Sequence, residues 1–306
     1  MKKSIKHHAL LVAFSSVLAV SSASAANSFY SSGDLVLYFQ KTSGTGSTNV
    51  VYANLGNAAT DFRGAATGAD AANKIQFLDL SSTLISAFGS GWATDPSVYA
   101  GLAGVYSAST NLTQSYNLDP NRTVYVSAAR TSVGTIGVKS SGGYTIGSNN
   151  TMNTFSSAIL TQNEAFADAD GANGYNASVI ISNSDTAVNV SQIGTMNPIG
   201  AGLNGFNGSI TGTSMQSADA ATFGTIDGVG STAFALDLYR IEAVNNIAGQ
   251  VGQGQTVRRG TFEGTVALGT DGQVSFMTSP VPEPSALTLS GLAAGALVLR
   301  RRRRSA

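Results

Sequence analysis

Apolar and polar residues alternate along several stretches of the chain, which is the pattern of β-strands whose two faces meet different surroundings. The clearest case is 122–128, where Val124 and Val126 share one face and Thr123 and Tyr125 share the other. The stretch 232–242 alternates as well, although a helix is a competing interpretation there. We predict strands over both ranges.

Two pairs of strand-forming stretches, the first of them beginning with apolar residues on both faces at 34–40, are separated by turn-forming residues and predict antiparallel hairpins. The first hairpin joins 34–40 to 49–55 through a segment rich in Gly, Ser and Thr. The second joins 261–268 to 273–277 through a turn that contains Asp271-Gly272. Because a hairpin is specified by residues close in sequence, these are the strand pairings that the sequence predicts most directly.

Other strands are expected where the pattern is shorter or interrupted by glycine. The stretch 98–106 contains Gly101 and Gly104, which indicate a bulge or the close approach of another backbone. A strand is also predicted at 178–181, and 75–78 is either a short strand or the start of a helix. Three segments are rich in small polar residues and glycine: 56–73 is expected to be a loop, 131–150 a surface hairpin or loop, and 184–231 a long loop or several short edge strands.

Two stretches have the apolar spacing of short amphipathic helices. The first is 80–88, which Ser81 or Ser82 would cap and Gly89 would end. The second is 152–167, followed by a glycine-containing turn. No fixed-period repeat or dividing linker is apparent, so we predict a mainly β passenger domain at 26–280, built as a β-sandwich of antiparallel sheets with two short helical insertions.

The N-terminal segment 1–25 has the three parts of a secretory signal peptide. Lys2, Lys3 and Lys6 form a basic region, and an apolar region at 9–20 follows. Ala23-Ser24-Ala25 is a small-x-small cleavage site, so we expect an N-terminal signal helix that signal peptidase removes after Ala25.

The C-terminal segment 281–306 also has three parts in a fixed order. Val281-Pro282-Glu283-Pro284 comes first, and its prolines keep the backbone extended. The apolar segment 285–299 follows, and we expect it to form a transmembrane helix, although it is shorter than an ordinary one. A block of arginines, which stays on the cytoplasmic side of a membrane, closes the chain: Arg300, Arg301, Arg302, Arg303 and Arg304.

This tail resembles the PEP-CTERM sorting signal of exported proteins of Gram-negative bacteria. The resemblance implies recognition by an exosortase, a membrane-embedded protease-transpeptidase that processes its substrates at or near the Pro-Glu-Pro motif. It also implies transient anchoring in the inner membrane and delivery to the cell surface or to an exopolysaccharide-rich matrix. The resemblance covers 281–306 alone and says nothing about the activity of the passenger.

Removing both ends changes the composition of what remains. Residues 26–281 keep 9 Lys and Arg against 16 Asp and Glu, a net charge of −7, which argues against nucleic acid as a partner. Both histidines, His7 and His8, lie in the signal peptide, and the chain has no cysteine. The mature protein therefore lacks the residues of Ser-His-Asp and Cys-His catalytic systems, and zinc, haem and iron-sulfur sites are not expected.

Paired carboxylates remain as a possible acid-base system, of the kind that glycosidases use across a cleft. No two of them have a telling context, although Asp237 and Glu242 lie on or at the end of a predicted strand. Solvated surface carboxylates are the alternative interpretation. The candidates are Asp34, Asp79, Asp95, Asp119, Glu164, Asp237, Glu242 and Glu263.

Two further patterns suggest ligands. The oxygen-rich stretch 168–174 offers Asp168, Asp170 and Asn173 to calcium, but it lacks the distal Glu of a calcium loop, and a turn that ends the preceding helix is the competing interpretation. Aromatic residues near glycine-rich segments could stack on sugars or could belong to the core: Trp92, Tyr99, Tyr106 and Tyr144.

These patterns leave two main functions open, beside an adhesin-like module that uses calcium. We expect a non-enzymatic structural or interaction protein of the cell surface or extracellular matrix, without a cofactor. The alternative is a carbohydrate-binding module or a carboxylate-dependent polysaccharide hydrolase in the same matrix. Signal peptidase, exosortase and matrix exopolysaccharide are the expected partners.

Overall fold

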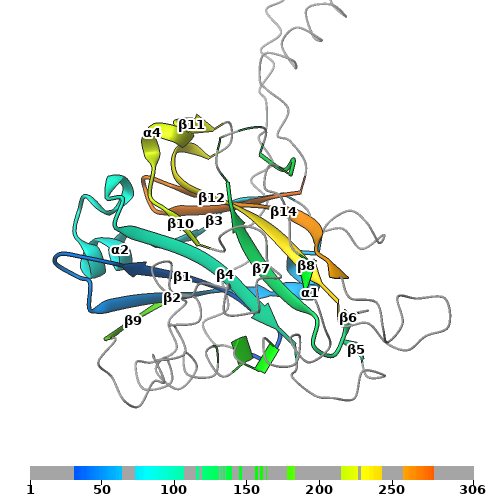
Figure 1. Cartoon of the computed structure of the whole chain (residues 1–306). Coiled ribbons are helices and arrows are strands. Elements are labelled where there is room, and N and C mark those ends of the chain that lie inside the picture. The colour runs from blue at the N-terminus through cyan, green and yellow to red at the C-terminus, as the bar shows by residue number, and fades with distance from the viewer. Residues whose placement is uncertain are drawn as a thin grey trace, which may run out of the picture.

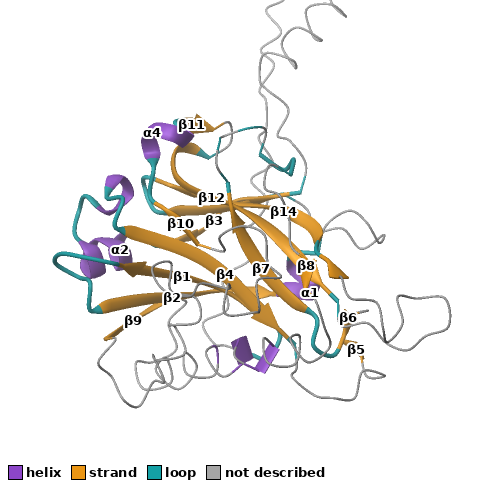
Figure 2. Cartoon of the chain, viewed as in Figure 1, coloured by secondary structure: helices purple, strands orange, loops and turns teal. Residues whose placement is uncertain are grey.

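The computed structural model describes residues 31–63, 73–106, 119–130, 178–182, 215–226, 229–242 and 258–278, together with short pieces between 115 and 163. These residues form a mainly β structure around one 11-stranded sheet (Figures 1 and 2). Its strands are β1 (Asp34–Lys41), β2 (Asn49–Asn57), β3 (Lys74–Asp79), β4 (Val98–Val105), β7 (Val124–Ala129), β9 (Ser178–Ser182), β10 (Met215–Ser217), β11 (Thr225–Ile226), β12 (Gly230–Ile241), β14 (Thr261–Gly269) and β15 (Gln273–Met277).

Both predicted hairpins are confirmed. β1 pairs with β2 and β14 pairs with β15, each antiparallel. The second hairpin turns at residues 270–272, where Gly272 takes a φ of 88° and its amide nitrogen donates to the carbonyl oxygen of Gly269 at 3.0 Å. A side chain on Gly272 would also collide with Ser81, so both the turn and the packing require glycine.

The competing helix at 232–242 is excluded, because β12 is a 12-residue strand in the interior of the sheet. It pairs with β14 on one side and β7 on the other. The strand at 75–78 is likewise confirmed as β3, and those at 98–106, 122–128 and 178–181 as β4, β7 and β9. At β4, a side chain on Gly104 would lie 2.9 Å from the Asp34 carbonyl oxygen, which confirms the close backbone approach at this glycine.

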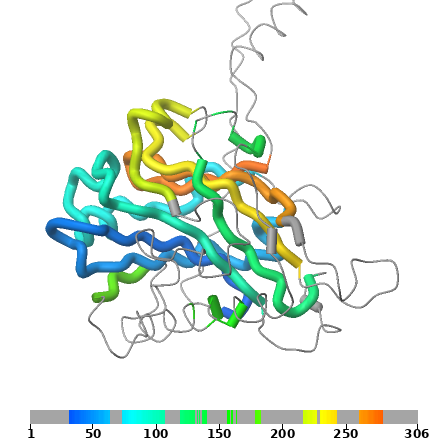
Figure 3. Tube along the Cα trace, viewed as in Figure 1, coloured from blue at the N-terminus to red at the C-terminus, as the bar shows by residue number. Residues whose placement is uncertain are grey.

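The expected β-sandwich is replaced, in the described residues, by a single curled antiparallel sheet that resembles half a barrel. Its main strand order is β3-β15-β14-β12-β7-β4-β1-β2-β9. β3 follows the β1–β2 hairpin in the chain, but it lies at the opposite edge of the sheet, next to β15 (Figure 3). The next element, helix α2 (Ser81–Phe88), contacts β2 and β9 at the opposite end. Because Leu80 alone joins β3 to α2, the two ends of the sheet must curl toward each other.

The curled sheet buries apolar side chains on both faces. One cluster lies between the sheet and α2 and includes Phe39, Phe62, Leu84, Phe234 and Phe276. A second cluster covers the other face and contains Tyr38, Tyr52, Tyr239 and Ile159 among others. Burial on both faces explains why apolar residues point to both sides of the sheet from β1 and β12.

The helix at 80–88 is confirmed, and Gly89 is its C-cap, but the expected cap by Ser81 or Ser82 is wrong. Leu80 takes the N-cap position without a side-chain bond, and Asp79 Oδ1 instead accepts from the Ser81 amide at 2.8 Å. Of 152–167, the described residues 156–157, 159–160 and 163 are helical, as predicted. The rest of that range lies outside the described residues.

The glycine-rich segments contain short regular elements, which include short strands in 184–231, one of the two alternatives there. The range 56–73 holds the helical turn α1 (Ala58–Asp61), and 184–231 holds β10, α4 (Ala220–Phe223) and β11. β8 (Thr145–Ile146) pairs with β13 (Arg258–Arg259), far along the chain, and β5 (Ser115–Tyr116) pairs with β6 (Asp119–Pro120). In the part of the chain that the structure describes, no helix is long and apolar enough to cross a membrane. The expected signal helix at 1–25 and membrane segment at 285–299 lie outside it.

Candidate functional site

Two of the candidate carboxylates hold local backbone structure. Asp34, at the start of β1, is buried and accepts from the Ser31 amide at 2.8 Å and from Asn54 Nδ2 at 2.9 Å. Burial raises the pKa of Asp34, against the lowering effect of these two hydrogen bonds. Asp79 binds the first turn of α2, and the bond from the Ser81 amide lowers its pKa. Both carboxylates therefore form hydrogen bonds that stabilise the fold.

Asp95 closes the loop between η1 (Trp92–Thr94) and β4. Its Oδ2 lies 2.8 Å from Lys41 Nζ, and its Oδ1 accepts from the Ser97 amide at 2.9 Å and the Ser97 hydroxyl at 2.6 Å. These bonds, that of Lys41 above all, lower the pKa of Asp95 from 3.8 to about 2. The carboxylate is therefore an anion that ties β1 to the start of β4.

Replacing Asp95 by asparagine should remove a pH-dependent contribution to stability. A lowered folded-state pKa stabilises the protein above the unfolded pKa of 3.8, and the effect disappears as pH falls toward about 2. Because the pair is partly solvated, we expect a loss of only about 1 kcal/mol at pH 6. Urea unfolding of both proteins at pH 6 and pH 3 should show the difference shrinking at the lower pH, and an equal difference at both would contradict this role.

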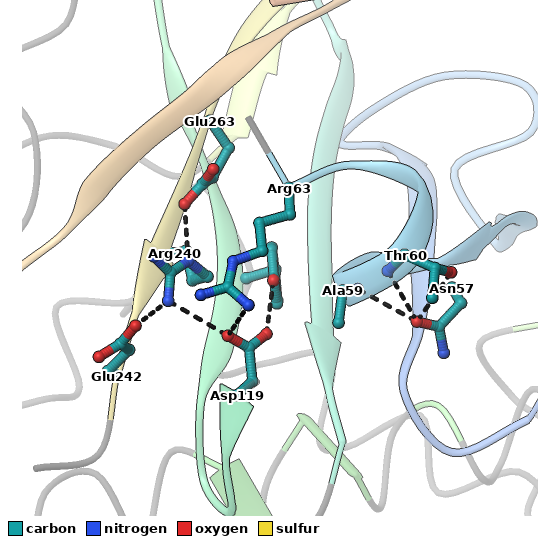
Figure 4. A network of polar contacts seen from close by, with 9 residues as sticks. Asn57, Ala59, Thr60, Arg63, Asp119, Arg240, Glu242 and Glu263 are labelled. Atoms are coloured by element: carbon teal, nitrogen blue, oxygen red, sulfur yellow. Dashed lines mark hydrogen bonds and ion pairs between the residues drawn. The ribbon is translucent and has the colours of Figure 1, made fainter. Parts of the chain in front are cut away.

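A mostly buried polar cluster surrounds Arg240, near the end of β12 (Figure 4). Its Nε donates to Glu263 Oε1 at 2.7 Å, and its Nη1 lies 3.2 Å from Asp119 Oδ1 and also binds Glu242. Arg63 Nη1 lies 3.4 Å from the same oxygen of Asp119. We call these five residues the Arg240 cluster.

Local structure places each member of the cluster. Asn57 Oδ1 accepts from the Ala59 and Thr60 amides at 3.2 and 3.1 Å, which caps α1 and positions Arg63 just beyond that helix (Figure 4). Asp119 stands on β6, and its Oδ2 accepts from the Tyr125 hydroxyl at 2.6 Å. Glu263 is on β14, which pairs with β12. Chain segments that are distant in sequence therefore converge on one guanidinium.

The electrostatics of the cluster favour ion pairing over proton transfer. Burial lowers the pKa of Arg240, but the hydrogen bond and charge of Glu263 outweigh burial and raise it. Burial, together with the charge of Asp119, raises the pKa of Tyr125 far above its ordinary range. The side chains of Asp119 and Glu263 are each 1% exposed, so neither faces a space that a sugar could enter. The partly exposed Glu242 is bound to Arg240.

A second buried pair joins Arg130, at the end of β7, to Asp237 in the middle of β12. Arg130 Nη1 lies 2.5 Å from Asp237 Oδ1, and both side chains are 0% exposed. Thr265 Oγ1 bonds to the same Asp237 oxygen at 3.1 Å, and Arg130 Nη1 also donates to the Val138 carbonyl oxygen at 3.0 Å. Gln216 Nε2 donates to the Arg130 carbonyl oxygen at 2.7 Å. The pair therefore connects β7, β10, β12 and β14.

The structure separates the two carboxylates that the sequence places near each other. Asp237 binds Arg130 and Glu242 binds Arg240, so they do not face one another across a cleft. Asp119, Glu242 and Glu263 do come together, but around a cation. The arginines were not predicted as their partners. The sequence did contain a sign that Arg240 is buried and needs a partner, because Arg240 continues an otherwise apolar alternating face of β12.

Trp92 belongs to the core and does not present its ring for stacking on a sugar. It is 2% exposed and stacks on Phe234, with ring centroids 6.3 Å apart and an interplanar angle of 5°. Tyr99 and Tyr106 are half-buried, and Tyr99 packs against the second core cluster. Tyr144 lies outside the described residues.

The calcium prediction falls on residues outside those described: Asp168, Asp170 and Asn173, as does the carboxylate Glu164. Within the described ranges, no group of three or more acidic or histidine side chains has the arrangement of a metal site. The calcium site at 168–174 therefore stays a prediction, and the described residues offer no other candidate metal site.

Comparison with known families assigns the C-terminal end of the chain. Residues 280–304 match the family model of the PEP-CTERM protein-sorting motif. The match includes Val281–Pro284 and the arginines 300–304, which lie outside the described residues. The chain therefore carries, at its C-terminal end, a segment that matches a protein-sorting motif.

More particularly, it carries the PEP-CTERM signal of an exosortase substrate, with a passenger domain whose family is not identified. The signal implies export, transit through the membrane and sorting to the cell surface. No curated protein and no solved structure matches the chain.

Proposed function

We propose that this chain is a structural or interaction protein that exosortase delivers to the cell surface or to an exopolysaccharide-containing extracellular matrix. The observation that carries the proposal is the sorting motif at 280–304, preceded by a β domain. Signal peptidase removes 1–25, the segment 285–299 holds the chain in the inner membrane, and exosortase then acts near Pro284. The passenger 26–280 is the part that remains.

The absence of catalysis is also part of the proposal, and the Arg240 cluster and the Arg130–Asp237 pair support it. A glycosidase needs one carboxyl group that gives up a proton and one that attacks or activates water, both facing a cleft. Asp119, Asp237 and Glu263 are instead buried against arginines, in positions that a substrate does not reach. These carboxylates stabilise the strands that they connect.

The sorting step predicts a defined C-terminus. Mass spectrometry of the protein released from the cell surface should find a chain that begins at Ala26 and ends near Pro284, without Arg300–Arg304. The double variant Pro282→Ala, Pro284→Ala should keep its tail and stay with the membrane fraction, because the extended recognition segment is lost. Pro280→Ala, which lies just before the Val281–Pro284 segment, is the matched control and should be processed normally.

Two results would contradict the proposal. A surface form that keeps Arg304 would show that the tail is a permanent anchor. Saturable and selective binding of the exported protein on a glycan array would instead make it a carbohydrate-binding protein, and turnover of a polysaccharide would make it an enzyme.

A further inference from the structure

The strands of the curled sheet run alternately in opposite directions, because every pairing in the main strand order is antiparallel. β2, β4, β12 and β15 therefore finish at the same end of the sheet at which β1, β3, β7 and β14 begin. We call this the tail end, because β15 is the last described strand before the sorting motif at 280–304. The opposite end, which holds the hairpin turns at 42–48 and 270–272, is the loop end.

Contacts at the tail end hold the chain just before it enters the sorting motif. Asn73, which directly precedes β3, accepts from the Thr278 amide at 2.8 Å and from the Thr278 hydroxyl at 3.3 Å. Lys74, the first residue of β3, lies 3.4 Å from Asp61 of α1. The folded domain therefore extends to Thr278, and α1 lies at the same end of the sheet.

The loops at the other end of the sheet contact one another. Asn49, at the start of β2, donates from Nδ2 to the Ala87 carbonyl oxygen of α2 at 2.9 Å. The Leu80 amide, just before α2, donates to the Gly272 carbonyl oxygen in the β14–β15 turn, also at 2.9 Å. The loop end is therefore one continuous surface, and α2 and α1 lie at opposite ends of the sheet (Figure 2).

Only a short piece of chain separates the folded domain from the predicted membrane segment at 285–299. Residues 279–284 lie between them, and a chain of this length spans at most about 22 Å. The sheet is longer, because strands of 8 to 12 residues, such as β1 and β12, measure about 25–40 Å. While the tail is in place, the tail end is therefore confined near the membrane, and the loop end is not.

We propose that the tail end of the sheet faces the inner membrane during transit, and that the loop end is the surface that meets partners outside. β15 holds this orientation because it pairs with β14 on one side and β3 on the other, and Val274, Phe276 and Met277 are each 0% exposed. The attachment point therefore cannot move to another side of the domain without disrupting the sheet. The inference rests on the proposed function, since it requires 285–299 as the membrane anchor.

Single fluorophores at the two ends test the orientation, because the chain has no cysteine of its own. Thr60→Cys on α1 labels the tail end and Ser90→Cys, between α2 and η1, labels the loop end; both residues are exposed. The full-length proteins are placed in vesicles of phosphatidylethanolamine and phosphatidylglycerol that contain a lipid with an energy acceptor on its headgroup. Transfer should be at least about twofold more efficient from position 60 than from position 90, since the two ends differ by the length of the sheet.

A longer spacer is the matched control. An insert of about twenty Gly and Ser residues after Thr278 should reduce the difference between the two labels, because a flexible linker lets the domain turn over. Circular dichroism melts check that each variant folds. Equal transfer from both positions without the insert, or more transfer from position 90, would overturn the orientation even if the tail is processed as proposed. Protein that does not float with the vesicles would contradict the membrane anchor itself, and the orientation with it.

Discussion

Replacing Arg130 by methionine should lower the free energy of unfolding by about 3–5 kcal/mol, because it leaves a carboxylate without its cation inside the protein. Asp237 is 0% exposed, and Arg130 is the cation 2.5 Å from its Oδ1. Methionine keeps much of the length of the arginine side chain, so the effect reports mainly the lost charge. Urea unfolding of the full-length proteins in detergent, followed by circular dichroism, measures it.

The control is the double variant Arg130→Met, Asp237→Leu, which removes both charges. Buried ion pairs add little net stability over well-packed apolar residues, so the double variant should regain a substantial part of the loss. If Arg130→Met alone costs less than about 1 kcal/mol, the pair is solvated in solution and does not connect the strands as described.

Replacing Trp92 by alanine should also cost about 3–5 kcal/mol, as expected when a large buried aromatic side chain is removed. Trp92 is 2% exposed, stacks on Phe234 and packs into the core cluster between the sheet and α2. Because it is the only tryptophan, its fluorescence disappears in the variant, and unfolding must be followed by circular dichroism.

Ile85→Ala provides the comparison for Trp92→Ala, since Ile85 is 48% exposed on the nearby helix α2. Its stability should stay within about 0.5 kcal/mol of the wild type. A Trp92→Ala protein of unchanged stability would place the ring at the surface and would make it again a candidate for stacking on a sugar.

The elements that the sequence predicted well are those set by neighbouring residues. Turn residues between two neighbouring strand-forming stretches specify the pairing of β1 with β2 and of β14 with β15, so both hairpins were predictable. Helix α2 was predictable from apolar spacing, but its cap was not. Ser81 and Ser82 are both residue types that cap helices, so the sequence offered either one. Asp79 accepts the hydrogen bond from the Ser81 amide instead, because it lies at the end of β3, just before the helix.

The curled sheet and the partners of the charges could not be predicted in the same way, because both depend on contacts between distant segments. β3, which follows the N-terminal hairpin, joins β15, the final strand of the sheet, and no local pattern indicates that pairing. Arg130 and Asp237 likewise come from strands that are far apart in the sequence. The sequence does not show whether a carboxylate contacts water, a sugar or an arginine. Its surroundings in the folded protein decide whether it can act as an acid or a base.

The sequence by itself determined where the protein is sent, since a sorting machinery recognises a short linear segment such as Val281–Pro284 with its apolar and arginine-rich extension. It also excluded cysteine chemistry by composition alone, and it confined histidine to His7 and His8. Only the tertiary structure decided what the passenger's polar groups do, because burial and pairing depend on contacts between distant segments. Folding buried Asp119, Asp237 and Glu263 against arginines, and it set the end of β15 opposite the turns of both hairpins.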